Sequence, residues 1–471
     1  MSIPKHAPSA RKRDGLAAPT QLQWAMLGSF VLVLAFLGGS SRSDVAHNIV
    51  LRPAAALLSI SAVYSLRLVD FERDKALLLL MMAAIFWIIL QLVPIPPFAW
   101  RALADREFIA KIDDFVGYAD MWRPISLASF RGFDSAFAMI VPMAGLVLAV
   151  SAKASQRMLL SVVAVLGLLN ASLGLLQFFG GSDSPFYIFP GASPGALEGI
   201  FGNENHSAVF SAIALLVISR LALDSELSGN APWQRLSLGA AFGVILLTVL
   251  ISGSRAGLIA TLASLLAIGA MSFMVMPRTD LYIGSAADRS SFRKRGRATL
   301  VTCSAAIVMV IFAFVWFERS LAFGDITERN AFEDLRWSLW PVLREMSEGN
   351  WLFGTGFGSF EAIYRLYEPS DLLFPAYVNH AHNDWAQLVI EGGLPAMVLL
   401  ASLLWWIVAA LVDLGKGGHA SRGRMIFWVA LVMIFAAASL IDYPLRTPIF
   451  QATVVWLLMC LSFDRSSADK R

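Results

Sequence analysis

The chain has 471 residues, of which 57% are apolar and only 15% are charged, and its formal net charge is +3. Soluble globular proteins carry about 25% charged residues, so this composition predicts an integral membrane protein and excludes intrinsic disorder, collagen-like repeats and a disulfide scaffold. Cys303 and Cys460 both lie within long apolar runs, where packing or contact with lipid explains them. Most of the excess positive charge lies in short connections between apolar segments, so no nucleic-acid partner is expected.

A membrane-spanning helix needs roughly 20 mostly apolar residues, and about 12 such runs follow one another along the chain. They begin near Gln21, His47, Ala76, Ser135, Met158, His206, Leu236, Arg255, Ala298, Asp384, Met425 and Thr447. The first run follows a basic stretch and imitates a secretory signal, but its apolar part is longer than the usual hydrophobic region of about 7 to 15 residues. We therefore interpret it as an uncleaved helix, and we predict an all-α, polytopic membrane protein.

Basic residues indicate the orientation of these helices. They occur in the N-terminal tail and again after the eighth apolar run, at Arg278, Arg289, Arg293, Lys294, Arg295 and Arg297. The connection 180–205 contains no Lys or Arg. Because cytoplasmic connections carry the excess of Lys and Arg, we expect both termini in the cytoplasm and the connection 180–205 on the outer side.

Two long connections fall on the outer side, from about Pro94 to Phe133 and from about Glu318 to Asn383. Loops of this length are usually functional or disordered. The second is rich in aromatic residues and places apolar side chains on one helical face, which predicts an amphipathic helix within a large, partly helical outer loop; these side chains are Phe332, Leu335, Leu339 and Leu343. We divide the chain into a cytoplasmic basic tail (1–20), N-terminal transmembrane helices (21–200), a second transmembrane region (201–463) that includes the outer loop 318–383, and a cytoplasmic tail (464–471).

Several common catalytic motifs are absent from the sequence. It has no glycine-rich phosphate loop that ends in Gly-Lys-Ser or Gly-Lys-Thr, no His-Glu-x-x-His zinc motif and no Asp-x-Asp pair for a metal-bound sugar nucleotide. The closely spaced glycines of 354–359 do not lie between a predicted strand and a helix, so they indicate a tight turn. We therefore predict no cofactor and no metal site.

The segment 379–384, Asn-His-Ala-His-Asn-Asp, ends the second outer loop and opens a helix. His382 carries the side chain best suited to proton transfer near neutral pH, and Asn383 or Asp384 is positioned to cap the helix and to orient the ring. His380 and Asn383 are candidates for substrate contact. The alternative is that both histidines are interfacial capping residues.

Two arginines lie at or near membrane depth. Arg255 separates two apolar runs with almost no loop, where an unpaired charge in lipid costs at least about 2.5 to 3.5 kcal/mol. Arg336 lies on the predicted amphipathic helix, and its guanidinium is able to grip phosphate oxygens with two parallel hydrogen bonds. The alternatives are a surface ion pair with Glu333 for Arg336 and a side chain that reaches the interface for Arg255.

A third polar cluster, Gly202-Asn203-Glu204-Asn205-His206, lies at the start of an apolar run on the same outer side. The amides of Asn203 and Asn205 are suited to bind sugar hydroxyls. A helix N-cap with solvated neighbours explains the cluster equally well.

Together these motifs resemble those of the O-antigen ligase and polymerase superfamily. The resemblance rests on Gly202–Asn205, Ser252–Arg255, Arg336 with Trp340, Gly354–Phe360, and His382-Asn383 followed by nine residues and Gly393. It covers about residues 202–393, and Asp442–Arg446 resembles the family's short polar turn before its last helices. The first five apolar runs match the family only in being hydrophobic.

The resemblance implies a metal-independent glycosyltransferase of the bacterial inner membrane. Such an enzyme takes a glycan from an undecaprenyl diphosphate carrier on the periplasmic side and transfers it to a hydroxyl of a glycan, lipid A core or protein, in lipopolysaccharide or other cell-surface polysaccharide biosynthesis. Arg255 and Arg336 match the arginines expected to bind the diphosphate, and His382 matches the histidine expected to activate the acceptor. Direct displacement at the anomeric carbon would invert its configuration.

Other functions remain open at the level of sequence. A transporter or flippase of the same glycolipid would use the same arginines but would require no base, and a membrane scaffold would require neither. The motifs do not separate a ligase from a polymerase, and they do not encode the sugar, the acceptor or the oligomeric state.

Overall fold

The computed structural model describes residues 19–42, 44–189, 195–224, 226–227, 231–275, 304–310, 312, 316, 338–373 and 378–468. This part of the chain is almost entirely helical and contains one short antiparallel sheet, in which β1 (Pro94–Ile95) pairs with β2 (Arg123–Pro124). The prediction of an all-α protein is therefore confirmed in its class.

The helices follow the predicted apolar runs closely. The N-terminal half contains α1 (Gln21–Leu37), α2 (His47–Val63), η1 (Leu68–Phe71), α3 (Lys75–Leu90), α4 (Pro97–Arg101), α5 (Glu107–Val116), α6 (Ser129–Ala138), α7 (Ile140–Ser151), α8 (Gln156–Gly180) and α9 (Glu204–Leu223). The C-terminal half contains α10 (Pro232–Ile251), α11 (Arg255–Val275), α14 (Trp340–Asn350), α15 (Phe360–Tyr367), η2 (Ser370–Leu372), α16 (Asp384–Gly415), α17 (His419–Ile441), η3 (Pro444–Arg446) and α18 (Pro448–Ala468).

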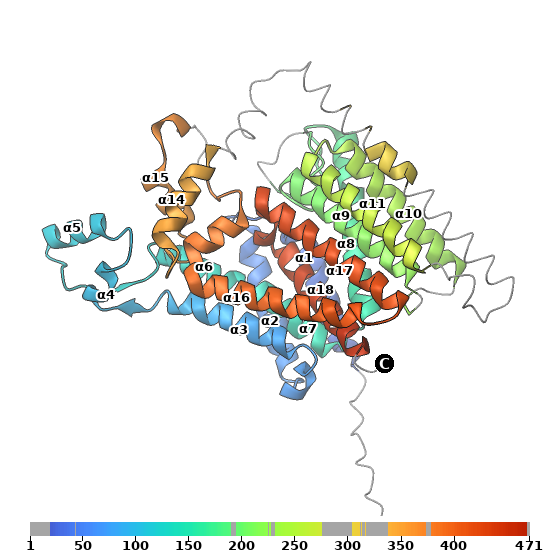
Figure 1. The fold of residues 1–471 in the computed structure, drawn as a ribbon, viewed down its shortest axis with the longest axis horizontal. Coiled ribbons are helices and arrows are strands. Elements are labelled where there is room, and N and C mark those ends of the chain that lie inside the picture. The colour runs from blue at the N-terminus through green and yellow to red at the C-terminus, as the bar shows by residue number, and fades with distance from the viewer. Residues whose placement is uncertain are drawn as a thin grey trace, which may run out of the picture.

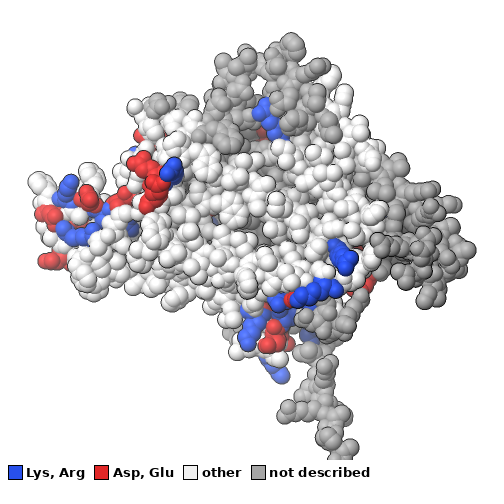
Figure 2. Space-filling model, viewed as in Figure 1, with Lys and Arg blue, Asp and Glu red and all other residues white. Residues whose placement is uncertain are grey.

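The length and apolar character of these helices identify a membrane protein. Within the described ranges, 7 helices are long and apolar enough to cross a membrane, and α1, α2 and α3 are shorter apolar helices. The ninth predicted run, from Ala298, lies largely outside the described residues, so the predicted total of about 12 spans stays a prediction. Figure 2 shows charged side chains gathered mainly over the projecting region of α4, α5, α14 and α15 and near the turn between α2 and α3, with a broad uncharged surface between them.

Helix α9 is the centre of the bundle. It packs against α8, α10, α11 and α17. Of the residues in its most apolar stretch, 89% are buried inside the protein, as expected of a helix that is hydrophobic all round. Small residues allow two of these neighbours to approach closely: a Cβ atom at Gly167 of α8 would lie 2.2 Å from the side chain of Ala214, and one at Gly257 of α11 would lie 2.2 Å from that of Ala208. Close approach at small residues is typical of helix packing in membranes.

The two long connections meet at one end of the bundle, where α4, α5, α14 and α15 project (Figure 1). Asp105, from the first connection, accepts hydrogen bonds from Asn350 Nδ2 at 2.5 Å and Tyr367 Oη at 2.6 Å in the second. Leu339 and Leu343, from the predicted amphipathic face, are buried in the small core of this region. Phe332 and Leu335 lie outside the described residues.

A buried ion network fixes the C-terminal ends of α9 and α18. Asp464 accepts hydrogen bonds from Arg220 at 2.6 and 2.8 Å, from the Trp428 indole at 2.7 Å and from Gln156 at 2.9 Å. Arg220 and Asp464 are each 1% exposed. The network therefore joins α8, α9, α17 and α18 through one carboxylate.

We expect Asp464→Ala to lower the stability of the protein by about 3 to 5 kcal/mol, because it leaves the Arg220 guanidinium buried without its counter-charge. Thermal unfolding of the purified protein in detergent, followed by intrinsic tryptophan fluorescence, measures the effect. Glu348→Ala is the control, since Glu348 pairs with Arg344 on an exposed helix face and an exposed ion pair contributes little. Equal melting temperatures for the two variants would contradict this assignment.

Candidate active site

Two histidines from different parts of the chain approach one carboxylate. Asp442 Oδ1 lies 3.7 Å from His206 Nε2 and 3.8 Å from His382 Nδ1. The ring of the neighbouring Tyr443 contacts both imidazoles, with centroid separations of 5.4 Å for His206 and 4.9 Å for His382. A third imidazole, His380, lies 4.6 Å from the same ring. These five residues form the cluster that we call the histidine cluster.

The ends of three helices position these side chains. His206 lies in the first turn of α9, His382 lies in the loop before α16, and Asp442 is the C-cap residue of α17. Helix ends carry unpaired backbone groups and break the apolar pattern of a span, so polar side chains concentrate there. The cluster therefore lies at one end of the bundle, on the side where α16 begins.

His382 adopts an uncommon backbone conformation, with φ of +49°. The left-handed region is costly for a residue with a Cβ atom, so the surrounding structure must hold it. The next residue, Asn383, fixes the chain at this point, because it is the N-cap residue of α16 and its side chain accepts a hydrogen bond from the Ala386 amide at 3.0 Å. The predicted capping role of Asn383 is thus present, and its contact with substrate stays a prediction.

The two histidines that face Asp442 differ in access. The His206 side chain is 2% exposed, whereas that of His382 is 20% exposed. Only His382 is therefore reachable by a substrate without rearrangement of the cluster. Burial of the His380 imidazole, together with the nearby charge of Arg446, holds its pKa well below 6.5, so it is neutral at physiological pH.

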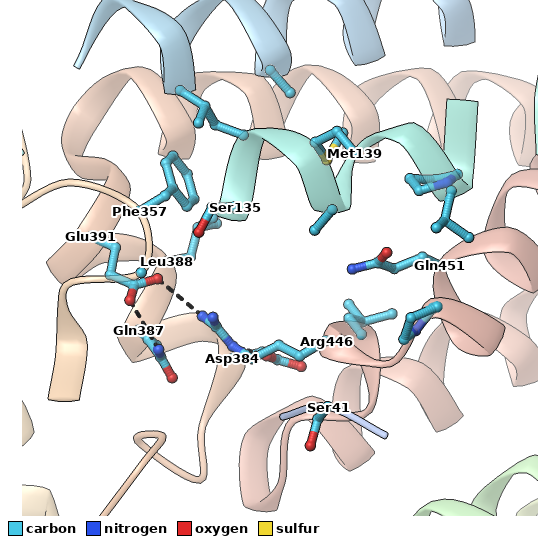
Figure 3. A pocket seen from close by; sticks show the side chains of 18 of the residues that line it. Ser41, Ser135, Met139, Phe357, Asp384, Gln387, Leu388, Glu391, Arg446 and Gln451 are labelled. Atoms are coloured by element: carbon cyan, nitrogen blue, oxygen red, sulfur yellow. Dashed lines mark hydrogen bonds and ion pairs between the residues drawn. The ribbon is translucent and has the colours of Figure 1, made fainter. Parts of the chain in front are cut away.

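Glu391 connects the histidine cluster to the rest of the site. It lies in the N-terminal part of α16, just before the bend at Gly393, is completely buried, and faces Arg446 Nη2 at 3.2 Å. It also accepts hydrogen bonds from Gln387 Nε2 and from the Phe360 amide, both at 3.1 Å. Figure 3 shows the Glu391 carboxylate between Gln387 and Arg446. Gln387 in turn accepts from the Ala381 amide at 3.0 Å, which fixes the segment between the two loop histidines.

The glycine-rich turn of 354–359 packs against a bend in α16. The Thr355 amide donates to Ile390 O at 2.8 Å and the Gly356 amide donates to Glu391 O at 3.0 Å. These carbonyls lose their helical partners because Gly393, at φ +60° and ψ −160°, interrupts the helix. The turn that the glycines predicted is therefore present, and its function is to seal the bend beneath the histidine cluster.

Arg255 is the first residue of α11 and lies beside the same end of α9. The preceding Ser254 donates its hydroxyl to Asn205 Oδ1 at 2.7 Å, and Asn205 is adjacent to His206. The structure thus joins the Arg255 turn to the histidine cluster through α9. Asn203 caps α9, accepting from the Asn205 amide at 2.8 Å. Arg336 lies outside the described residues, so its place relative to Arg255 and His382 stays a prediction.

Asp442, Glu391 and Arg446 were not predicted as site residues, although the turn 442–446 was part of the resemblance. Each carried a signal that could have identified it: Glu391 is an ionisable residue inside an apolar run, and Asp442 and Arg446 bound a five-residue polar turn between two such runs. Ionisable residues at membrane depth are functional candidates by default. Among the described residues, no group of three His, Cys, Asp or Glu side chains is arranged to hold a metal ion.

We expect Gly393→Ala to destabilise the protein by about 1 to 3 kcal/mol, since alanine is strained at a positive φ. Its Cβ atom would also lie 2.6 Å from Gly354 N. Thermal unfolding measures the change. Gly349→Ala is the matched control, because Gly349 lies inside α14 and a Cβ atom there meets only Tyr367 Oη at 3.6 Å. A loss of stability in the control as large as that in Gly393→Ala would refute the strain argument.

The comparisons with known proteins bear on the region that contains these elements. Residues 240–401, from α10 to the middle of α16, match a family model described as O-antigen ligase. No curated protein matches the chain. The matched range includes Arg255, Arg336, the glycine-rich turn and His382, which are residues on which the resemblance rested. The match supports that resemblance: residues 240–401 of this chain are similar to the O-antigen ligase family.

Proposed function

We propose that this protein is a membrane glycosyltransferase that transfers a glycan from an undecaprenyl diphosphate carrier to an acceptor hydroxyl on the periplasmic side of the bacterial inner membrane. The observation that carries the proposal is the position of His382, partly exposed, with Nδ1 facing Asp442 at 3.8 Å. At this distance the carboxylate makes an electrostatic contact with the imidazole and no hydrogen bond, and a carboxylate so close stabilises the imidazolium that forms when a histidine acts as a general base.

His382 is the proposed base. With Nδ1 directed at Asp442, Nε2 is the nitrogen available to the acceptor hydroxyl. As the acceptor oxygen bonds to the anomeric carbon of the donor, its proton passes to Nε2 and the bond from the anomeric carbon to the diphosphate breaks. The electron pair of that bond leaves with the diphosphate. Asp442 then stabilises the imidazolium that forms, and the displacement inverts the anomeric configuration.

Arg255 and Arg336 are the proposed diphosphate ligands. A diphosphate is already a good leaving group, so its departure requires neutralisation of charge more than a proton donor. A guanidinium remains protonated at any physiological pH and binds phosphate oxygens in pairs. Arg255 supports this role by its position at the start of α11, next to the turn that contacts α9. This chemistry needs neither a metal ion nor ATP.

The periplasmic location rests on the distribution of Lys and Arg. The connection 180–205 and the start of α9 lie together at one side in the predicted orientation, opposite the basic connection that follows α11. The first turn of α9, which carries His206, and the loop before α16, which carries His382, are joined through Asp442. A lipid-linked glycan displayed outside the cytoplasm would meet the histidine cluster from this side.

We expect His382→Ala to reduce glycan transfer by a factor of about 10² to 10⁴, the usual contribution of a general base. The assay uses purified protein in proteoliposomes with a lipid-linked donor and an acceptor. His419→Ala is the control, since His419 lies at the far end of α17 from Asp442 and is exposed. Unchanged transfer by His382→Ala would refute the assignment of His382 as the base. No transfer by the natural protein would favour a transporter or flippase, which binds the same lipid without a base.

Replacing the orienting carboxylate tests its role separately. Asp442→Asn keeps the size of the side chain but removes the charge that stabilises the imidazolium. We expect transfer to fall, although less than in His382→Ala, and we expect the acidic limb of the pH–rate profile to move to lower pH. A lower rate with an unmoved profile would mean that Asp442 is only a structural residue.

A further inference from the structure

His206 belongs to the histidine cluster, but the proposed reaction gives it no role. It lies in the first turn of α9, outside the range 240–401 that matches the family model. Its side chain is 2% exposed, and within the described ranges its Nε2 atom is buried and forms no hydrogen bond. Buried polar atoms almost always have a hydrogen-bond partner, so an exception calls for an explanation.

The His206 ring is fixed by packing so that Nε2 faces Asp442. The ring meets Tyr443 and Phe450 edge to face, at centroid separations of 5.4 and 6.1 Å. Nε2 lies 3.7 Å from Asp442 Oδ1, slightly beyond hydrogen-bond distance, and His382 Nδ1 lies 3.8 Å from the same oxygen. Catalytic hydrogen bonds are often long in a free enzyme and shorten when substrate binds. One carboxylate oxygen is therefore shared by a buried imidazole and a partly exposed one.

The first turn of α9 also reaches the Arg255 turn. Asn205, next to His206, accepts a hydrogen bond at 2.7 Å from the hydroxyl of Ser254, the residue before Arg255. Because α9 packs against four other helices, its first turn is a rigid support. His206 thus faces Asp442 from the same turn that contacts the proposed diphosphate ligand, so one helix end fixes both parts of the site.

The charge of His206 decides how it affects the proposed base. The charged or titratable groups at the ends of the elements around it are Asp442, Tyr443 and Arg446 after α17, His380, His382 and Asp384 at the start of α16, and Glu204 and Arg255 at the starts of α9 and α11. A protonated His206 would neutralise Asp442 and would repel the imidazolium that forms on His382. Only a neutral His206 leaves the charge of Asp442 to stabilise His382.

We propose that His206 is a positioning residue of the transfer reaction: as a neutral donor it holds the Asp442 carboxylate toward His382 and contacts no substrate itself. Its burial keeps it away from the acceptor hydroxyl, so it acts only through Asp442. A carboxylate held in this way keeps its charge close to Nδ1 while the proton arrives at Nε2 of His382. This inference rests on the proposed function and adds to it the residue that orients the carboxylate.

Two substitutions separate the N–H donor from the ring. His206→Phe keeps an aromatic ring against Tyr443 and Phe450 but has no N–H group, whereas His206→Gln has no ring but carries an amide N–H about as far along the side chain as Nε2. In the proteoliposome assay we expect His206→Phe to lower kcat by a factor of about 10 to 10², with an unchanged KM for the acceptor, since misplacement of a catalytic group by about 1 Å has an effect of this size. His206→Gln should keep most of the rate. An equal loss in both variants would overturn the proposal, because the ring or a charge on it would then be required.

The pH dependence of kcat distinguishes positioning from packing. When the carboxylate is no longer held toward His382, the imidazolium loses stabilisation, so we expect the acidic limb of the profile in His206→Phe to move to lower pH, as in Asp442→Asn. An unmoved limb would mean that His206 only packs. A limb that moves to higher pH would mean that His206 is a cation that repels the imidazolium on His382. Either result would overturn the proposal.

A packing control and a double variant complete the kinetic test. Phe450→Leu removes a ring that contacts His206 but leaves Nε2 and Asp442 in place, so it should lower the thermal stability while the pH profile stays where it is. Adding His206→Phe to His382→Ala should cause no further loss of rate, because a residue that acts through the base has no effect once the base is gone. The same fractional loss in both backgrounds would show an independent role and would overturn the proposal.

Chemical modification of His382 provides a measurement that needs no glycan transfer. Diethyl pyrocarbonate reacts with neutral imidazole, so its rate of reaction against pH, with the modified site identified by mass spectrometry, reports when the partly exposed His382 loses its proton. We expect the midpoint at lower pH in His206→Phe than in the natural protein, and His206→Leu replaces this variant if it does not fold. An unmoved midpoint in a protein that transfers glycan would overturn the role of His206 alone. A shifted midpoint in a protein without transfer would refute the proposed function alone.

Discussion

A buried carboxylate within an apolar helix must be satisfied by its neighbours, and Glu391 shows how much structure one such requirement organises. It is fully buried in α16, so each of its oxygens needs a partner. Arg446, Gln387 and the Phe360 amide provide them. Arg446 and Asp442 lie in the same short turn after α17. The Glu391 carboxylate therefore binds the amide that follows the glycine-rich turn and, through Arg446, also holds the turn that presents Asp442 to the histidines.

The site that results is built from interruptions of helices. The first turn of α9, the loop before α16, the C-cap of α17 and the bend at Gly393 all contribute to it. In hydrocarbon a regular helix satisfies the hydrogen bonds of its own backbone. Polar groups gather where a helix ends or bends, and there other groups must supply the missing hydrogen bonds. Asn203 and Asn383 supply these hydrogen bonds as helix caps, and the amides of Thr355 and Gly356 supply them at the bend.

The sequence predicted the helices well, because long apolar runs and their polar boundaries are local features. Helices α1, α2, α11 and α16 begin at the predicted residues, Gln21, His47, Arg255 and Asp384. The partners across the bundle were not predictable in the same way. Nothing local indicates that Arg446 meets Glu391, 55 residues earlier in the chain, or that His206 and His382 share Asp442. Such pairs depend on helix packing, which many different contacts determine together.

Arg446 lies close to the histidine cluster, but its ion pairs decide what it is able to bind. Arg446 lies between two carboxylates, one of them fully buried, so a phosphate could bind it only by displacing a partner and leaving a buried charge unsatisfied, which costs several kcal/mol. Arg446 therefore positions the turn that carries Asp442 and is unsuited to bind the diphosphate, although it is closer in sequence to the histidine cluster than Arg255 is. A guanidinium that is already neutralised by a buried acid thus has little binding energy left for an anionic substrate.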